Sequence, residues 1–288
     1  MSSAVRAACV IGWPIEHSRS PLIHNYWLNL YRIPGAYRSE AVPPDQFRNF
    51  VRSLAERGYV GANVTVPHKE AALALSHGDD RARAVGAANT LWLDGVLRST
   101  NTDVEGFLHN LSACAPGWES DAATAVVLGA GGAARAVVYG LLERGTRRII
   151  VSNRTPGRAL ELQARFAERF ASRVQIAPWA ECDRWLAEAK VLVNATTLGM
   201  QGQPDLTIDI ARLPADAVVA DLVYAPLVTP LLHSARARGL RTADGLGMLI
   251  YQAMGGFQLW FGKRPEITSE LRTLLQRDLS AARPATEE

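Results

Sequence analysis

The chain has 288 residues, 48% of them hydrophobic, which is enough for two domains of ordinary size. Its net charge is only +3 and no long run of one sign occurs, so the composition does not support nucleic-acid binding. The apolar runs are shorter than a membrane span, and residues 5–13 lack the features of a signal peptide. Three distant cysteines outside any metal-ligand spacing indicate buried thiols, so we expect a cytoplasmic protein without a metal site or a membrane partner.

The first predicted elements are a strand over residues 7–12 and a helix over residues 21–30. Ser20 precedes Pro21, an order typical of a serine N-cap followed by proline at the first helical position. The loop that contains Ser18 and Ser20 is therefore expected at a helix N-terminus, which favours a carboxylate or a phosphate. A plain cap without a ligand is the alternative for this loop taken alone.

A second amphipathic helix is predicted over residues 47–54, followed by a strand over residues 59–66. Lys69 comes just after this strand, and α/β folds place functional groups at the carboxyl ends of strands. A solvated lysine in the first turn of a helix is the alternative. The six histidines follow no metal-binding spacing, so no metal is predicted.

Three short polar segments border strand patterns in this half of the chain. They are residues 63–69, 89–90 and 101–103, and the second is followed by Asp94-Gly95, a hairpin signal. Their joint placement predicts a pocket for one polyhydroxylated ligand lined from several strand ends. Each segment also has an ordinary explanation, because Asn, Thr and Asp are common turn and cap residues.

A glycine-rich turn follows an apolar run at residues 124–128. Gly129, Gly131 and Ala134 match the three small positions of a dinucleotide-binding turn, in which backbone approaches a pyrophosphate and a helix begins. A helix over residues 133–144 and a strand over 148–152 complete a βαβ unit of about 30 residues. Glycines also serve other sharp turns, but this context favours a dinucleotide site.

The segment after that strand distinguishes the two nicotinamide cofactors. NAD enzymes keep an acid there for the ribose hydroxyl, whereas residues 153–158 contain Arg154 and Arg158 and no acid. Arginine suits a 2′-phosphate, so NADP is predicted. Further buried strands are predicted over 190–194 and 217–222, helices over 231–238 and 248–261, and a frayed tail over 280–288.

Read over nearly its whole length, the sequence resembles the shikimate dehydrogenase family. The matching segments are Gly12-x-Pro14-x-x-His17-Ser18-x-Ser20-Pro21-x-x-His24-Asn25, Asn63-Val64-Thr65-x-Pro67-x-Lys69, Asn89-Thr90-Leu91, Asn101-Thr102-Asp103, residues 129–136, Asn153-Arg154-Thr155, Asn194-Ala195-Thr196 and Asp244-Gly245-Leu246-Gly247-Met248-Leu249-x-x-Gln252-Ala253. The resemblance implies reversible NADPH-dependent reduction of 3-dehydroshikimate to shikimate, a step of aromatic biosynthesis.

The resemblance also implies an α/β fold of two domains. An N-terminal substrate domain, residues 1–106, is completed by C-terminal helices in 245–288, and a Rossmann-type NADP-binding domain with a parallel sheet, 107–244, is inserted between them. The family's catalytic pair matches Lys69 and Asp103, with Lys69 as general acid in reduction and general base in oxidation. The substrate contacts match Ser18, Ser20, Asn63, Thr65, Asn89, Tyr224 and Gln252. The cofactor contacts match Gly129, Ala130, Gly131, Gly132, Ala133, Ala134, Asn153, Arg154, Thr155, Arg158, Thr196, Leu222, Gly245 and Met248.

Two other functions remain open from the sequence. A quinate dehydrogenase or a dual quinate/shikimate dehydrogenase using NAD or NADP would share these motifs. An NADP-binding regulator on the same scaffold would be expected to lose Lys69 or Asp103, and both are present. The expected partner is a small-molecule substrate, and a monomer and a homodimer are equally compatible with the sequence.

Overall fold

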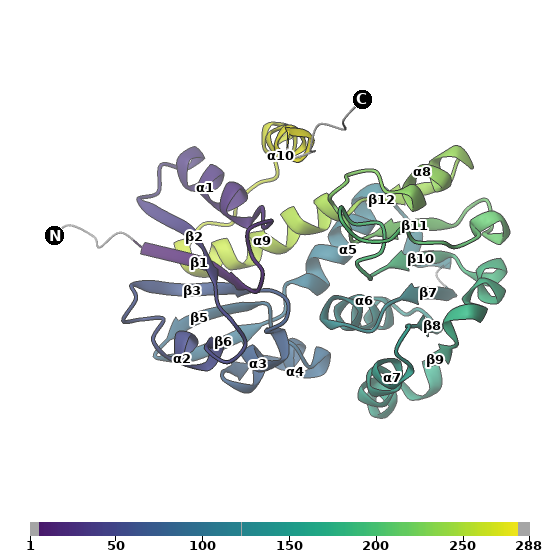
Figure 1. The fold of residues 1–288 in the computed structure, drawn as a ribbon, viewed down its shortest axis with the longest axis horizontal. Helices are drawn as coiled ribbons and strands as arrows, with labels where there is room; N and C mark the ends of the chain where they lie inside the picture. Colours follow the sequence, from purple (N-terminus) through teal and green to yellow (C-terminus); the bar gives the residue numbers. More distant parts are fainter. Residues whose placement is uncertain (1–5, 122, 282–288) are drawn as a thin grey trace. The chain divides into compact units, whose positions relative to one another are not determined.

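The chain divides at Thr102 and Gln252 into two separately packed units (Figure 1). The structure, a computed structural model, describes residues 6–121 and 123–281. One unit combines the chain up to Thr102 with the chain from Gln252 onward, and the other is Asp103–Tyr251. The expected α/β class, with an N-terminal unit completed by C-terminal helices and an inserted parallel-sheet unit, is confirmed. The functional boundaries at residues 106/107 and 244/245 stay a prediction.

The sheet of the first unit is mixed and has the strand order β2-β1-β3-β5-β6-β4. β1, β2 and β3 are parallel neighbours, whereas β5 runs antiparallel to both β3 and β6. The hairpin expected at Asp94-Gly95 is present, with Asp94 paired to Val96 and Gly95 in the left-handed region at the tip. The strand bounds are β1 (Arg6–Gly12), β2 (Gly35–Ala41), β3 (Tyr59–Val64), β4 (His77–Gly78), β5 (Thr90–Asp94) and β6 (Val96–Thr100).

Helices cover this sheet on both sides (Figure 1). The helices on one side are α2 (Phe47–Arg52), α3 (Lys69–Ala74) and α4 (Asp80–Val85). Those on the other are α1 (Ser20–Leu30) and the part of α9 (Gly245–Phe261) from Gln252 onward, and α10 (Ser269–Ala281) packs against α1. The indole N–H of Trp260 donates to the carbonyl of Leu91 at 2.8 Å. A Cβ on Gly61 would lie 2.1 Å from the same indole nitrogen, so only glycine allows α9 to approach β3 this closely.

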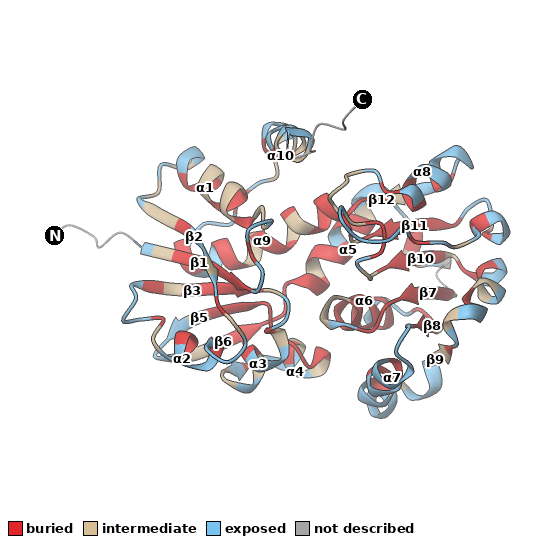
Figure 2. Cartoon of the chain, viewed as in Figure 1, coloured by how far each residue is buried: buried red, intermediate tan, exposed pale blue. Residues whose placement is uncertain are grey.

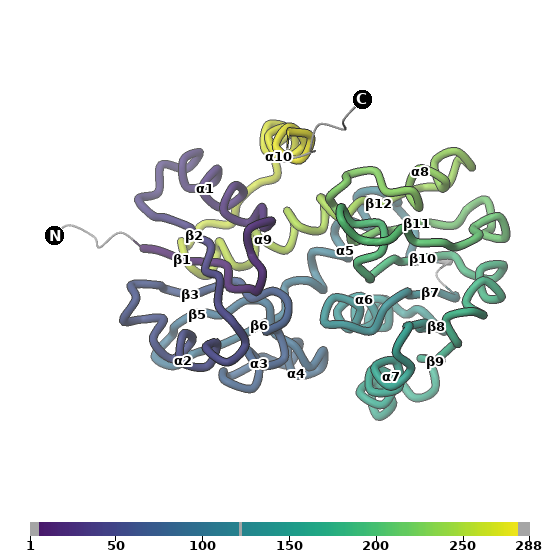
Figure 3. Tube along the Cα trace, viewed as in Figure 1, coloured from purple at the N-terminus to yellow at the C-terminus, as the bar shows by residue number. Residues whose placement is uncertain are grey.

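The sheet of the second unit is wholly parallel, in the order β12-β11-β10-β7-β8-β9. Figure 3 follows the chain outward from β7 to β9 and then back to the other side of β7 for β10 to β12. This reversal makes the edge beyond the carboxyl ends of β7 and β10 a topological switch point, where open α/β sheets bind ligands. The strand bounds are β7 (Thr124–Leu128), β8 (Arg148–Ser152), β9 (Val174–Ala177), β10 (Val191–Asn194), β11 (Val218–Asp221) and β12 (Arg241–Ala243).

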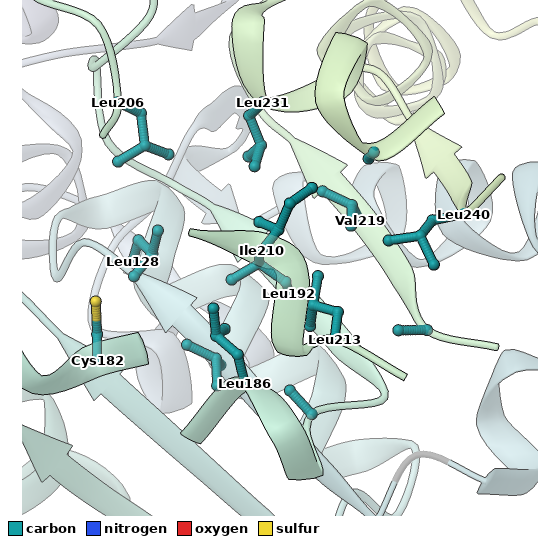
Figure 4. Packing of buried hydrophobic residues seen from close by; sticks show 14 of the residues in the cluster. Leu128, Cys182, Leu186, Leu192, Leu206, Ile210, Leu213, Val219, Leu231 and Leu240 are labelled. Carbon is teal, nitrogen blue, oxygen red and sulfur yellow. The ribbon is translucent and has the colours of Figure 1, made fainter. Parts of the chain in front are cut away.

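The central strands of this sheet are buried along their whole length, as parallel strands covered on both faces require (Figure 2). On one face Leu128, Leu192 and Val219 meet Leu186 and Leu231 in an apolar cluster (Figure 4). The remaining elements of the unit are α5 (Asp103–Cys114), η1 (Trp118–Asp121), α6 (Gly132–Glu143), α7 (Pro156–Phe170), η2 (Ala171–Arg173), η3 (Trp179–Glu188), η4 (Ile210–Arg212) and α8 (Pro230–Ala237). No helix in the described part of the chain is long and apolar enough to cross a bilayer.

Three local expectations are wrong. Ser20 is the first residue of α1 and not its N-cap, which is Arg19; the hydroxyl of Ser18 instead accepts the Ser20 N–H at 3.3 Å. Helix α9 begins at Gly245 rather than Met248. The carboxylate of Asp244 accepts the N–H of Gly247 at 2.9 Å and so gives a partner to an N–H group of the first turn. Residues 280–281 belong to α10 and not to a frayed tail, of which 282–288 lie outside the described residues.

Candidate active site

Lys69 stands at the start of α3, at the end of a turn that follows β3. The turn is closed by the His68 N–H, which donates to the Thr65 carbonyl at 2.9 Å, and the Lys69 carbonyl accepts the Ala88 N–H at 2.9 Å. His68 is buried, with its ring stacked on Phe47 at 4.3 Å between centroids. Burial lowers the pKa of His68, while its bond to a backbone carbonyl opposes the shift. The backbone under the half-buried Lys69 is therefore held from both sides.

Four polar side chains at or beside strand ends and one on α9 form a single buried network. The Asn63 amide donates to the Asn89 carbonyl and to the Thr90 hydroxyl, both at 3.2 Å. The Asn89 amide donates to the Thr102 hydroxyl at 3.0 Å and to the side-chain oxygen of Gln252 at 3.3 Å. The structure thus joins Asn63, Asn89 and Gln252, which are far apart in the sequence.

Tyr37 belongs to this network and was not predicted. Its hydroxyl donates to the side-chain oxygen of Asn63 at 2.6 Å, and its ring stacks on His24 at 4.0 Å. Its backbone is bonded in both directions to the side chain of Asn25. Burial raises the pKa of Tyr37 well above its usual value, so the phenol stays a donor and fixes the orientation of the Asn63 amide.

The remaining polar residues of the first unit differ in their exposure. Ser20 is buried, whereas Ser18 and Thr65 are half-buried. Asn101, which was part of a polar segment, directs its amide to the Ala87 carbonyl at 2.9 Å and therefore supports the backbone. Among the described residues no three His, Cys, Asp or Glu side chains gather as a metal site would require.

Asp103 and Tyr224 lie in the second unit. Asp103 is the first residue of α5 and is buried. Tyr224 is half-buried in the loop that joins β11 to α8. The pairing of Asp103 with Lys69 and the contact of Tyr224 with the substrate stay predictions.

The glycine-rich turn has the geometry expected of a dinucleotide site. Gly129 follows β7 with φ +109°, and a Cβ there would lie 2.8 Å from the Ala195 carbonyl oxygen. Gly131 is the N-cap of α6, and a Cβ there would meet nothing within 4 Å. Because the first N–H groups of a helix have no partner within it, the start of α6 favours an anion, and there is open space beside Gly131. The small residues Gly132, Ala133 and Ala134 form its first turn.

The other predicted cofactor residues lie at neighbouring strand ends of the same unit. Arg154 and Arg158 are exposed after β8, next to Thr155, the N-cap of α7. Asn153 donates to the carbonyl of Thr155 at 2.8 Å. Thr196 follows β10, Leu222 follows β11, and Gly245 and Met248 open α9. A Cβ on Gly245 would lie 2.3 Å from the Leu222 carbonyl oxygen, so this contact too requires glycine.

A parallel sheet with a glycine turn at its switch point in the second unit, together with a buried polar network in the first, is the arrangement of a dinucleotide-dependent oxidoreductase. Three family models match the chain: the shikimate dehydrogenase substrate binding domain over residues 10–91, shikimate / quinate 5-dehydrogenase over 115–201, and the shikimate 5′-dehydrogenase C-terminal domain over 245–269. A shikimate dehydrogenase (NADP(+)) of Rhodopseudomonas palustris strain BisB18 is 60% identical, with 96% of this chain and 99% of that protein covered. The chain belongs to the shikimate dehydrogenase family.

Solved structures support the same assignment. A shikimate 5-dehydrogenase of Thermus thermophilus in complex with NADP(H) and shikimate has a TM-score of 0.79 and 36% identity, covering 96% of this chain and 99% of its own. A quinate dehydrogenase of Corynebacterium glutamicum in complex with NAD has a TM-score of 0.86 and 30% identity, covering 94% and 99%. The fold is therefore shared by relatives that differ in substrate and in cofactor.

Proposed function

We propose that this protein catalyses the reversible NADP-dependent interconversion of shikimate and 3-dehydroshikimate, with Lys69 and Asp103 as its catalytic pair. The observation that carries the substrate assignment is the buried network of Asn63, Asn89 and Gln252. Pre-oriented amides and hydroxyls suit a polyhydroxylated ring, because each substrate hydroxyl needs a donor or an acceptor in a fixed place. Full-length identity of about 60% to named NADP-dependent shikimate dehydrogenases supports the same reaction.

The roles of the two catalytic residues follow from the charge that develops during the reaction. When bound, NADPH supplies a hydride to the carbonyl carbon of the substrate. Negative charge then grows on the carbonyl oxygen, and Lys69 stabilises that charge and donates the proton. In oxidation Lys69 takes the proton back, and the Asp103 carboxylate would orient the ammonium.

Substrate and cofactor would be held by different kinds of contact. Ser18 and Ser20, at the start of α1, would donate their hydroxyls to the substrate carboxylate, and Thr65 and Tyr224 would contact its ring. The backbone of Gly129–Ala134 would receive the pyrophosphate of NADP. Arg154, assisted by Arg158, would bind the 2′-phosphate, while Asn153, Thr155, Thr196, Leu222, Gly245 and Met248 would line the remainder of the cofactor.

The test is absorbance at the nicotinamide band after purified protein is mixed with shikimate and NADP, and separately with quinate and with NAD. We expect reduction with shikimate and NADP at a much higher kcat/KM than with either alternative. Comparable efficiency on quinate with NAD would replace this proposal by a quinate dehydrogenase. Absence of any reduction from neutral to alkaline pH would leave only a binding function.

Location and assembly complete the proposal. Cys9, Cys114 and Cys182 form no disulfide in the described part of the chain, which supports a reducing cytoplasmic location, although Cys114 is exposed and not buried as expected. Because both the substrate contacts and the cofactor contacts come from one chain, a monomer suffices for activity. Size-exclusion chromatography of the active protein with light scattering measures whether it also dimerises.

A further inference from the structure

Asp221 is a buried carboxylate at the carboxyl end of β11 that none of the roles above uses. Its side chain accepts three hydrogen bonds: from the Asn194 amide at 2.9 Å, from the Val223 N–H at 3.0 Å and from the Thr229 hydroxyl at 2.7 Å. Asp221 is 1% exposed. Burial raises its pKa to about 6, and the three donors oppose that shift because they favour the ionised form.

Asn194, on the neighbouring strand β10, links this carboxylate to the loop that follows β10. Its side-chain oxygen accepts the N–H of Thr196 at 3.1 Å and the Thr196 hydroxyl at 2.7 Å. Its amide also donates to the Leu198 carbonyl at 3.1 Å. Because the same amide donates to Asp221, the carboxylate fixes which way the amide faces, and the amide in turn shapes the loop at residues 195–198.

The glycine turn packs directly against that loop. At Gly129 an added Cβ would lie 2.8 Å from the Ala195 carbonyl oxygen and 3.2 Å from the Thr196 methyl group. Any movement of residues 195–196 toward β7 would therefore displace the turn that begins the anion site. A continuous line of contacts leads from Asp221 through Asn194 and Thr196 to Gly129.

The same carboxylate also ties the segment after its own strand. It accepts the Val223 N–H directly after Leu222. It also accepts the hydroxyl of Thr229, the N-cap of α8, and that hydroxyl accepts the Leu232 N–H at 3.3 Å. The loop that carries Leu222 and Tyr224 is thus anchored at both ends by one side chain.

We propose that Asp221 is a positioning residue for the cofactor, which sets the loops after β10 and β11 against the glycine turn without touching NADP itself. This inference rests on the proposed cofactor site, but its test measures binding and not turnover. Loss of the carboxylate removes one of the two acceptors of the Asn194 amide and leaves three donors without their bond to Asp221. NADPH affinity should then fall while the overall fold persists.

The decisive measurement is the dissociation constant of NADPH, by fluorescence titration, for Asp221→Ala and Asp221→Asn. We expect at least about a tenfold rise for Asp221→Ala, the factor that corresponds to one or two lost buried hydrogen bonds. Asp221→Asn should change it by no more than about threefold, because its oxygen still accepts from Asn194 and the Thr229 hydroxyl can reverse its role. Asp216→Ala is the matched control, since Asp216 stands before the opposite end of β11 and pairs with Lys190 at the surface.

Urea unfolding of each variant separates positioning from stability. If Asp221→Ala does not fold, Thr229→Val and Thr229→Ser decide, because only the valine variant removes a donor to the carboxylate. A rise in the NADPH dissociation constant for valine but not serine supports the proposal. An unchanged constant in Asp221→Ala, an equal rise in Asp216→Ala, or equal constants for the two Thr229 variants overturns it. Wild-type protein that binds NADPH but does not oxidise shikimate contradicts only the proposed function, whereas wild type that does not bind NADPH contradicts both.

Discussion

The two units offer their ligands different kinds of surface. In the first unit, candidate substrate residues such as Asn63 and Asn89 are buried and bonded to one another. In the second, the proposed anion site is backbone at the start of α6, and Arg154 and Arg158 are exposed. Removing one member of a buried network breaks several hydrogen bonds, whereas removing an exposed side chain breaks few interactions besides its own. Substitutions of these two kinds of ligand-facing residue should therefore differ in how far their effects spread.

The largest effect is expected at Lys69, in the first unit. Lys69→Ala removes the proton donor and should lower kcat by about 10²- to 10⁴-fold, with a much smaller change in KM for shikimate. Steady-state rates at saturating NADP measure this. Lys263→Ala, which removes a surface lysine that lies over the Tyr31 ring, should retain normal rates. Near-normal turnover in Lys69→Ala would remove the proposed role.

The cores of the two units should respond to acid in opposite directions. Burial lowers the pKa of His24 to about 3. Between that pH and about 6.5, His24 is therefore protonated in the unfolded chain and neutral in the folded chain. The stability that His24 contributes is complete above pH 6.5 and falls by about 3 kcal/mol by pH 4.5. Asp221, with its pKa raised to about 6, destabilises the fold above that pH and less so toward pH 4.

Urea unfolding at pH 7.5 and pH 4.5 tests the His24 contribution. His24→Phe preserves a ring for the stack on Tyr37 and should lose less stability between these pH values than wild type. His77→Ala, at an exposed position of the same unit, should follow wild type. Equal pH dependence in wild type and His24→Phe would contradict the assignment.

A pair of glycine variants tests whether the second unit depends on its backbone. Gly129→Ala forces φ +109° on alanine and sets its Cβ against the Ala195 carbonyl, which should cost about 2 kcal/mol of stability. Gly131→Ala meets no atom within 4 Å and should unfold like wild type, yet weaken NADPH binding by filling the space for the pyrophosphate. Thermal unfolding and NADPH titration report the two effects separately. Equal stability losses in both variants would contradict this division.

Tyr37→Phe tests the buried network by removing a single oxygen atom. The side-chain oxygen of Asn63 then loses its donor, the amide can turn over, and KM for shikimate should rise about tenfold, with a smaller change in kcat. Tyr26→Phe is the control, because the Tyr26 hydroxyl bonds instead to Thr268 at the start of α10. Similar KM values in the two variants would show that Tyr37 only supports the fold.

The smallest effect is expected at Arg154, in the second unit. Arg154→Ala should raise KM for NADP about fivefold, in line with an exposed charge pair, and leave KM for NAD unchanged. The NADP effect should shrink in high salt, because exposed charges are screened. Arg165→Ala, an exposed change on the same helix as Arg158, should alter neither constant. Equal losses with both cofactors would remove the proposed contact to the 2′-phosphate.

The parts of the fold that were predictable have strong local signals. The glycine turn at 129–134, the strand at 148–152 and the hairpin at 94–95 depend on residue types that the backbone itself requires. Strands β2, β9 and β12 were not predicted, because they are short or carry mixed polar residues and owe their pairing to neighbours distant in the chain. Tyr37 lies in β2, and an aromatic residue within this polar stretch was the signal that could have indicated a buried position.

The candidate site residues also divide into those that local sequence predicts and those that it does not. Lys69, Asn63 and the glycines could be chosen from motifs and from their position at strand ends. The bond between Asn89 and Gln252 joins residues more than 160 positions apart, and no local pattern reports it. Ser20 was predicted as a helix N-cap because serine before proline usually has that role. The helix instead begins at Ser20 itself, and the Ser18 hydroxyl accepts the Ser20 N–H.

The order in which the chain is made gives the discontinuous unit a further consequence. The N-terminal sheet obtains Trp260 against Gly61 and Gln252 against Asn89 only from the segment that follows the second unit. The parallel-sheet unit, in contrast, is continuous from Asp103 to Tyr251. During synthesis the cofactor unit can therefore fold while the substrate unit still waits for its last helices. A polypeptide truncated within α9 should retain a dinucleotide fold and lack a finished substrate site.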